Sequence, residues 1–166
     1  MVDAIKKRRA IREFLAEPIP EAVMNDILLS AMYAPSANAL HPWELIVVEN
    51  PDTRDRLSKV TPWATSAKTA AAVIVIVGHE SESPQWVEDA AIAAEHIWLT
   101  ATDHGLGACW IHARKNRNAE GEIKTILGIP SEHRVSCMMA LGTPVRPEPE
   151  HSEEAFDESK VKYEKY

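Results

Sequence analysis

A short basic segment near the N-terminus is the first feature that could do chemistry. Arginines occupy three of the five positions 8–12, and residues 5–12 carry five cations and no acid. Guanidinium groups bind phosphate in a bidentate manner, and backbone N–H groups at a helix end can assist them. An isolated charge cluster is more often a solvated surface. The segment therefore indicates either a small-anion site or an exposed basic patch.

A second polar stretch lies between a predicted helix and a predicted strand. It has the sequence Ala-Pro-Ser-Ala-Asn-Ala at 34–39 and continues as His-Pro-Trp at 41–43. The small residues around Ser36 and Asn38 allow a ligand to approach the backbone closely. The polar groups of this stretch can hydrogen-bond a planar ligand. The ordinary alternative is a connecting loop. Neither stretch identifies a function by itself.

Other common kinds of site lack their motifs. The chain has no Gly-x-Gly-x-x-Gly, no phosphate loop ending in Lys-Ser/Thr and no Gly-x-Ser-x-Gly. His96 and His104 lie eight residues apart, which does not suit a shared metal ion. The two cysteines, Cys109 and Cys137, have neither zinc-site nor disulfide spacing and are expected to be buried thiols. We therefore predict no metal site.

Composition limits the class of protein. The chain has 166 residues, 45% of them hydrophobic, and a formal charge of −7, which predicts a single globular domain spanning 1–166. An acidic chain with one short basic segment is a poor general nucleic-acid binder. The longest apolar run, 70–77, is far shorter than the roughly 20 residues of a membrane span. With no secretory signal, the expected location is cytoplasmic, without membrane or nucleic-acid partners.

Hydrophobic periodicity predicts four strands interleaved with helices, an α/β or α+β layered domain. The predicted strands are 45–48, 72–77, 108–111 and 135–141. The predicted helices are 2–9, 20–34, 52–60, 84–104 and 121–127, with Ser83 as the cap of the fourth. The pattern does not decide whether the strands are parallel.

The long helix 84–104 is apolar on more than one stripe. Ile92 and Leu99 lie outside the stripe that contains Ala90, Ala94 and Ile97. Such a helix has to be buried nearly all round, which a chain of this size can hardly do alone. A subunit interface is the natural explanation, and we therefore expect a dimer.

In this order, the motifs resemble the FMN-dependent nitroreductase family. The matching pieces are Arg-Arg-Ala-Ile-Arg-Glu-Phe at 8–14, the stretch at 34–43, the alanine-rich helix from Asp89, Gly-Leu-Gly-Ala-Cys-Trp-Ile at 105–111, Leu-Gly-Thr-Pro at 141–144 and the tail at 161–166. The resemblance covers nearly the whole chain. It implies an α+β three-layer sandwich, with a mostly antiparallel central sheet flanked by helices. It also implies an intertwined homodimer in which a C-terminal arm, about 148–166, reaches the partner.

The resemblance further implies one FMN in each interface pocket, held by three segments. The implied residues are Arg8, Arg9 and Ala10 at the phosphate, Arg12 near the pyrimidine edge of the flavin, Pro35, Ser36 and Asn38 from the other subunit, and Ile111, His112 and Ala113 where the backbone approaches flavin N5. No side-chain acid or base is demanded, because the flavin carries the chemistry. A fixed cation at Arg12 would favour the electron-rich reduced flavin.

The chain departs from the family pattern at two places. Ala10 stands where many members have Ser, which removes a hydroxyl contact to the phosphate. Many members carry a basic pair after the Leu-Gly-x-Pro motif, whereas this chain has Arg146 followed by Glu148 and Glu150. Those two carboxylates would repel a phosphate.

The expected function is an oxidoreductase that takes hydride from NAD(P)H. It would reduce a small electron-poor acceptor, such as a nitroaromatic or a quinone, by a ping-pong mechanism. One alternative is a flavin-binding or flavin-delivering protein without turnover. Another is an interaction module whose basic segment binds nucleic acid or an acidic partner.

Overall fold

A computed structural model describes residues 1–114 and 117–166 and contains one four-stranded sheet. The strands are β1 (Trp43–Val48), β2 (Ala72–Gly78), β3 (Gly107–His112) and β4 (Arg134–Gly142), in the order β1-β2-β4-β3. Every neighbouring pair is antiparallel. All four strands lie where the sequence predicts them, each extended by one or two residues. The antiparallel sheet agrees with the α+β fold that the resemblance implies.

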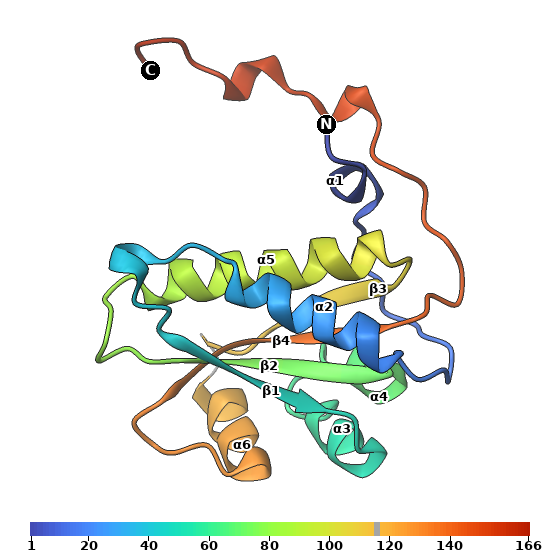
Figure 1. Cartoon of the computed structure of the whole chain (residues 1–166), viewed down its shortest axis with the longest axis vertical. Helices are drawn as coiled ribbons and strands as arrows, with labels where there is room; N and C mark the ends of the chain where they lie inside the picture. Colours follow the sequence, from blue (N-terminus) through green and yellow to red (C-terminus); the bar gives the residue numbers. More distant parts are fainter. Residues whose placement is uncertain (115–116) are drawn as a thin grey trace.

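Helices cover both faces of the sheet (Figure 1). One face carries α2 (Glu21–Met32) and α5 (Trp86–Asp103), and the other carries α3 (Pro51–Leu57), α4 (Ser66–Thr69) and α6 (Arg117–Leu127). Side chains of β2 alternate between two buried clusters, with Ile74 and Ile76 in one and Val73 and Val75 in the other. This alternation explains why the strand is an uninterrupted apolar run, and the predicted burial on both faces is confirmed.

Helix α5 starts two residues later than predicted. Helix α5 begins at Trp86 rather than Pro84, and Ser83 instead accepts a hydrogen bond from the Gln85 N–H at 3.2 Å. The Trp86 indole packs so closely on Gly78 that a Cβ there would lie 2.1 Å from an indole carbon. The N-cap position of α5 is Gln85 and has no side-chain cap, so Ser83 closes the preceding turn and does not cap α5.

Several short helices were not predicted, because they are too short to show periodicity. They are α4 and the 3-10 helices η1 (Ala37–Ala39), η2 (Glu153–Ala155) and η3 (Glu158–Lys160). Helix α6 also starts earlier than predicted, at Arg117, and α2 and α3 end earlier, at Met32 and Leu57. Helix α1 (Asp3–Lys7) lies inside its predicted range.

Helix α5 is not buried all round within one chain. Its inner stripe, including Ala90, Ala94 and Ile97, is fully buried, whereas Ile92 is 37% exposed and Leu99 is half-buried. The surplus apolar stripe that the sequence indicates therefore lies on the surface of the single chain. None of the helices in the described residues has the length and apolar character needed to cross a membrane.

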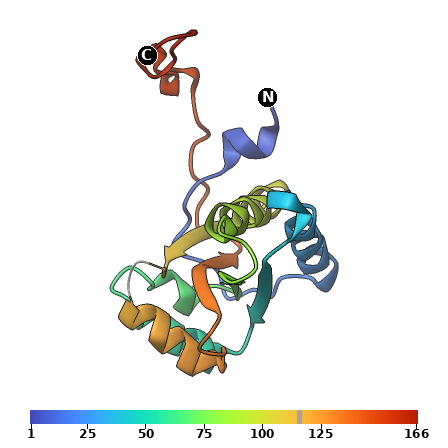
Figure 2. The ribbon, with the colours of Figure 1, turned by 90° about the vertical axis from the view of Figure 1, so that its left-hand side faces the viewer.

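The N-terminal segment runs along the free edge of β3. Ala10 bridges Ala108 in parallel, and the Ile11 N–H donates to the Ala108 carbonyl at 2.9 Å. A Cβ on Gly107 would lie 2.7 Å from the Ile11 side chain, so only glycine permits this approach. Helix α1 and the C-terminal arm, residues 148–166, project together from the body of the domain (Figure 2).

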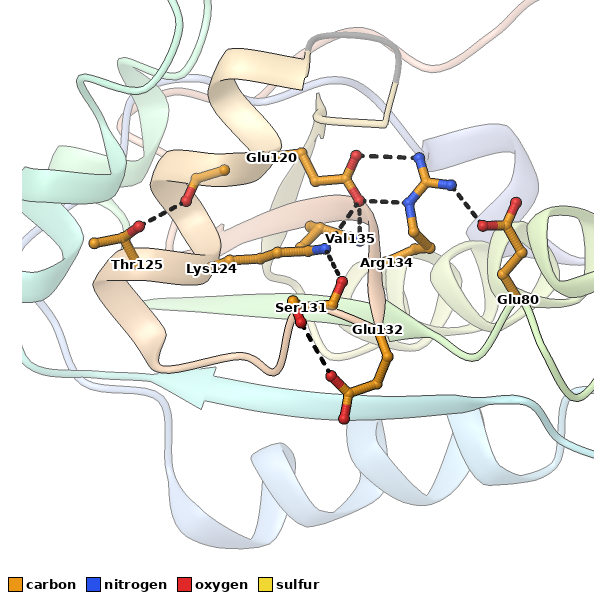
Figure 3. A network of polar contacts seen from close by, with 9 residues as sticks. Glu80, Glu120, Lys124, Thr125, Ser131, Glu132, Arg134 and Val135 are labelled. Atoms are coloured by element: carbon orange, nitrogen blue, oxygen red, sulfur yellow. Dashed lines mark hydrogen bonds and ion pairs between the residues drawn. The ribbon is translucent and has the colours of Figure 1, made fainter.

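A partly buried ion pair joins α6 to the start of β4 (Figure 3). The Glu120 carboxylate accepts from Arg134 Nε at 2.8 Å and Nη2 at 3.2 Å, and from the Val135 N–H at 3.1 Å. Arg134 also donates to Glu80 at 2.8 Å and lies over the Trp86 ring at 5.7 Å. Burial raises the pKa of Glu120, but the hydrogen bonds from Arg134 and Val135 outweigh it, so the pKa lies below its ordinary value.

Candidate functional site

The three arginines of the basic segment have different surroundings. The Arg8 guanidinium lies over the Trp98 ring, 4.5 Å from its centroid, and 3.8 Å from the Glu95 carboxylate. Burial raises the pKa of Glu95, and the positive charge of Arg8 opposes that rise. The Arg8 side chain therefore already packs against α5, and its charge is shared with a carboxylate.

Arg9 ties the C-terminal arm to the N-terminal segment. Its Nε donates to the Pro149 carbonyl at 2.7 Å and its Nη2 to the Glu150 carbonyl at 3.2 Å. Nearby, the His151 N–H donates to the Lys6 carbonyl at 2.9 Å. In this single chain the Arg9 side chain thus positions the arm. This partnership is invisible in the sequence, because it joins residues 140 positions apart.

Arg12 is exposed beside a hollow at the domain edge. It donates to the Ala10 carbonyl at 3.3 Å. The hollow has a volume of about 240 Å³ and is lined by Ala10, Ile11, Arg12, Glu13, Val145, Arg146 and Glu148. Arg146 is 3.5 Å from the Glu13 carboxylate, so its charge is partly neutralised. Arg12 and Arg146 therefore both present exposed positive charge to this hollow, while Glu13 pairs with Arg146 and Glu148 opposes an anion there.

The loop that contains Pro35, Ser36 and Asn38 is strained. Asn38, Ala39 and His41 have φ of 52°, 54° and 48°. Such values are uncommon outside glycine, and strain of this kind gathers at functional sites. Asparagine and histidine adopt this conformation more often than other residues, but alanine does not, so the sequence carries no such signal at Ala39.

The strained loop is fixed by two side chains. Ser36 Oγ accepts the His41 N–H at 2.8 Å, and Asp89 Oδ1, on α5, accepts the Ala37 N–H at 3.0 Å. Just beyond the loop, Trp43 Nε1 is buried without a hydrogen-bond partner among the described residues. In the sequence, Asp89 appears only as the start of an alanine-rich motif, which does not predict this contact.

One chain does not bring the loop and the arginines together. The loop meets α5 at Asp89, in its first turn, whereas Arg8 meets the helix at Glu95 and Trp98. At a rise of ~1.5 Å per residue, these anchors lie roughly 9–14 Å apart along the helix. Figure 1 shows η1 and α1 near opposite ends of α5. These two predicted segments of the site thus form separate groups along α5.

The third predicted segment lies at the end of β3. Ile111 and Ala113 are buried and His112 is half-buried. The Trp63 indole N–H donates to the His112 carbonyl at 3.5 Å, although the Trp63 residue is 55% exposed. Trp63 was not among the predicted site residues, because its only signal in the sequence is an aromatic residue in a Pro-containing loop.

Two other kinds of site, a metal site and a reactive thiol, find no support within the described residues. No group of three or more His, Cys, Asp or Glu side chains there is arranged to hold a metal ion. Cys109 and Cys137 are both buried and unpaired with each other, as predicted. Burial raises the pKa of the Cys137 thiol, so it is held in its neutral form.

Comparisons with known proteins agree on one family. The family model named Nitroreductase matches residues 5–81 and 60–143. A Methanothermobacter thermautotrophicus protein, named as a candidate NADH dehydrogenase/NAD(P)H nitroreductase, is 31% identical over 100% of this chain and 87% of its own length.

Solved structures give the same result. An FMN-dependent nitroreductase from Clostridium difficile is 31% identical, with a TM-score of 0.96 and complete coverage of both chains. A nitroreductase family protein from Clostridium novyi is 35% identical, with a TM-score of 0.78 over 86% of this chain and 83% of that one. The chain is therefore an oxidoreductase that belongs to the nitroreductase family.

Proposed function

We propose that the protein is a homodimeric FMN-dependent oxidoreductase that takes hydride from NAD(P)H and reduces small electron-poor acceptors. The observation that carries the proposal is the exposed Arg12 guanidinium beside the hollow at the β3 edge. Family membership supports a role for this cation near the pyrimidine edge of the flavin, which is the position that the resemblance implies for it. Nitroaromatics and quinones are the proposed acceptors, reduced by a ping-pong mechanism.

The residues present fit FMN in part. Arg8, Arg12 and Arg146 are donors suited to a phosphate or an electron-rich ring edge. The hollow of about 240 Å³ is smaller than an ordinary small-molecule pocket of roughly 300–1,000 Å³. A single chain thus offers part of a cofactor site, and the strained loop offers a second part elsewhere.

A second copy of the chain would supply the missing part. In the proposed dimer, Pro35, Ser36 and Asn38 of one subunit complete the site formed by the arginines of the other. The partly exposed Ile92 on α5 and the exposed Phe156 and Tyr163 on the arm support such an interface. The arm, about 148–166, would reach the partner, as the resemblance implies.

The proposed roles of the residues follow from their chemistry. FMN, when bound, supplies the group that accepts and returns hydride. Arg8, Arg9 and the backbone at Ala10 would hold its phosphate, and Arg12 would stabilise negative charge on the ring. The backbone of Ile111, His112 and Ala113 would approach N5, beside the exposed Trp63. No side chain is assigned as a general acid or base.

Visible absorption spectroscopy tests the proposed function. The purified protein, reconstituted with FMN, is expected to show flavin bands near one per subunit that bleach anaerobically with NADH or NADPH. Bands that persist would instead support the flavin-delivering alternative. A colourless protein that does not take up FMN would contradict both. A nucleic-acid-binding module is disfavoured, because the chain has a formal charge of −7 and only one short basic segment.

Arg12→Ala is expected to leave the dimer folded and to make the bound flavin harder to reduce. Removing a cation near the ring should lower the midpoint potential by about 30 mV or more, since 30 mV corresponds to ~1.4 kcal/mol for a two-electron couple. Potentiometric titration against reference dyes measures the shift. Arg12→Lys, which keeps the charge, is the matched control. An unchanged potential in Arg12→Ala would assign Arg12 to the solvated surface.

A further inference from the structure

Asp89 is a buried carboxylate that the proposed chemistry does not use. It lies in the first turn of α5 and is 3% exposed. Its Oδ1 accepts the Ala37 N–H at 3.0 Å, and its Oδ2 is 3.5 Å from Ser83 Oγ. A buried carboxylate is costly unless it is hydrogen-bonded, so these contacts fix its position firmly.

The contact with Ala37 joins the body of the domain to the strained loop. Ala37 directly precedes Asn38 and Ala39, two of the three residues of this loop with positive φ. Two further loop bonds, from Ala39 N–H to the Ser36 carbonyl and from His41 N–H to Ser36 Oγ, are internal. Internal bonds shape the loop but do not anchor it, whereas the bond to Asp89 holds it against α5.

We propose that Asp89 is the positioning residue that presents the 35–38 loop to the cofactor of the partner subunit. The inference rests on the proposed function, because it takes FMN as the ligand of that loop. A strained conformation persists only where its surroundings impose it. Asp89 imposes it through one hydrogen bond, which its buried carboxylate on α5 accepts from the Ala37 N–H. The loop is therefore organised before the ligand binds, which lowers the cost of binding.

The test compares FMN affinity in two substitutions of Asp89. Asp89→Asn keeps an acceptor oxygen where Oδ1 stands, whereas Asp89→Ala removes it. We expect the Kd for FMN, measured by flavin fluorescence quenching, to rise about tenfold or more in Asp89→Ala. We expect a rise of no more than about threefold in Asp89→Asn. Asp103→Ala, an exposed carboxylate on the same helix, is the matched control and should leave the Kd unchanged.

A second variant separates positioning from folding. Ala37→Pro removes the donor N–H without touching the buried carboxylate, and proline suits the first residue of a helical turn that follows the extended Ser36. Ala37→Pro should weaken FMN binding as Asp89→Ala does, and the double variant should be no weaker than either. This comparison stays informative even if Asp89→Ala fails to fold.

The outcomes distinguish the two proposals. A wild-type protein that does not bind FMN contradicts the proposed function. A wild-type protein that binds FMN, with the same Kd in Asp89→Ala and Ala37→Pro, overturns the role of Asp89 alone. A fall in the melting temperature of the FMN-free protein without a change in Kd would also overturn it, because Asp89 would then act only in folding.

Discussion

Arg134→Ala is expected to lower the free energy of unfolding by about 3 kcal/mol at pH 7. Glu120 is buried, with a side chain 7% exposed, and two of the three hydrogen bonds to its carboxylate come from Arg134. Removing the arginine leaves a buried carboxylate without that partner, and Lys124 at 3.8 Å compensates only in part. Chemical denaturation with urea measures the difference.

The loss of unfolding free energy in Arg134→Ala should become smaller at low pH. The pKa of Glu120 is lowered in the folded protein, so its stabilising contribution is present above the unfolded pKa of about 4.3. That contribution is lost as the pH falls through the lower folded value. The gap between wild type and Arg134→Ala should therefore narrow below about pH 4.

Glu80→Ala is the control for this prediction. Glu80 contacts the same arginine from the exposed end of the network, with a side chain 57% exposed (Figure 3). Exposed ion pairs contribute about 0–1 kcal/mol, so this variant should remain close to wild type. A loss in Arg134→Ala that is equally large at pH 3 and pH 7 would show that packing on Trp86, and not the charge on Glu120, explains it.

Gly78→Ala is expected to cost about 2–3 kcal/mol of unfolding free energy, because it overpacks a buried contact. The new Cβ would lie 2.1 Å and 2.5 Å from two carbons of the Trp86 ring, so the indole must move. Trp86 is 3% exposed and begins α5, which leaves it little room to do so. Thermal or urea unfolding measures the loss. Trp86→Leu should relieve part of it in the double variant.

Gly121→Ala is the matched control for a glycine substitution. Gly121 is exposed on α6, and a Cβ there would have no atom within 4 Å. Alanine is the better helix former, so this variant should gain about 0.5–1 kcal/mol. If both glycine substitutions changed the free energy of unfolding in the same direction, the close contact with Trp86 would not be the cause of the loss at Gly78.

The strands could be predicted because their residue types are typical of buried strands. The run at 72–77 is apolar and β-branched throughout, which is typical of a strand covered on both faces. The antiparallel pairing could not be derived from the pattern, since strand direction depends on how the connections cross the sheet. It was expected from the family resemblance alone.

The site was harder to predict, because its main contacts join distant parts of the chain. The composition of residues 8–12 favoured a solvated basic surface and left an anion site as the alternative. The structure separates their roles, with Arg8 on Trp98, Arg9 on the arm carbonyls and Arg12 exposed. The bond from Ala37 to Asp89 spans 52 positions and leaves no local signal. Periodicity and motif spacing reflect residues that are close in the sequence, so they do not reveal contacts between distant residues.

The separation of the two residue groups along α5 has a thermodynamic consequence for the proposed enzyme. When two chains share one ligand, ligand binding and chain association are linked by mass action. FMN should then tighten the dimer, and dilution of the protein should release FMN even when the affinity of each intact site is unchanged. The FMN content measured per subunit would therefore depend on the protein concentration as well as on the residues of the site.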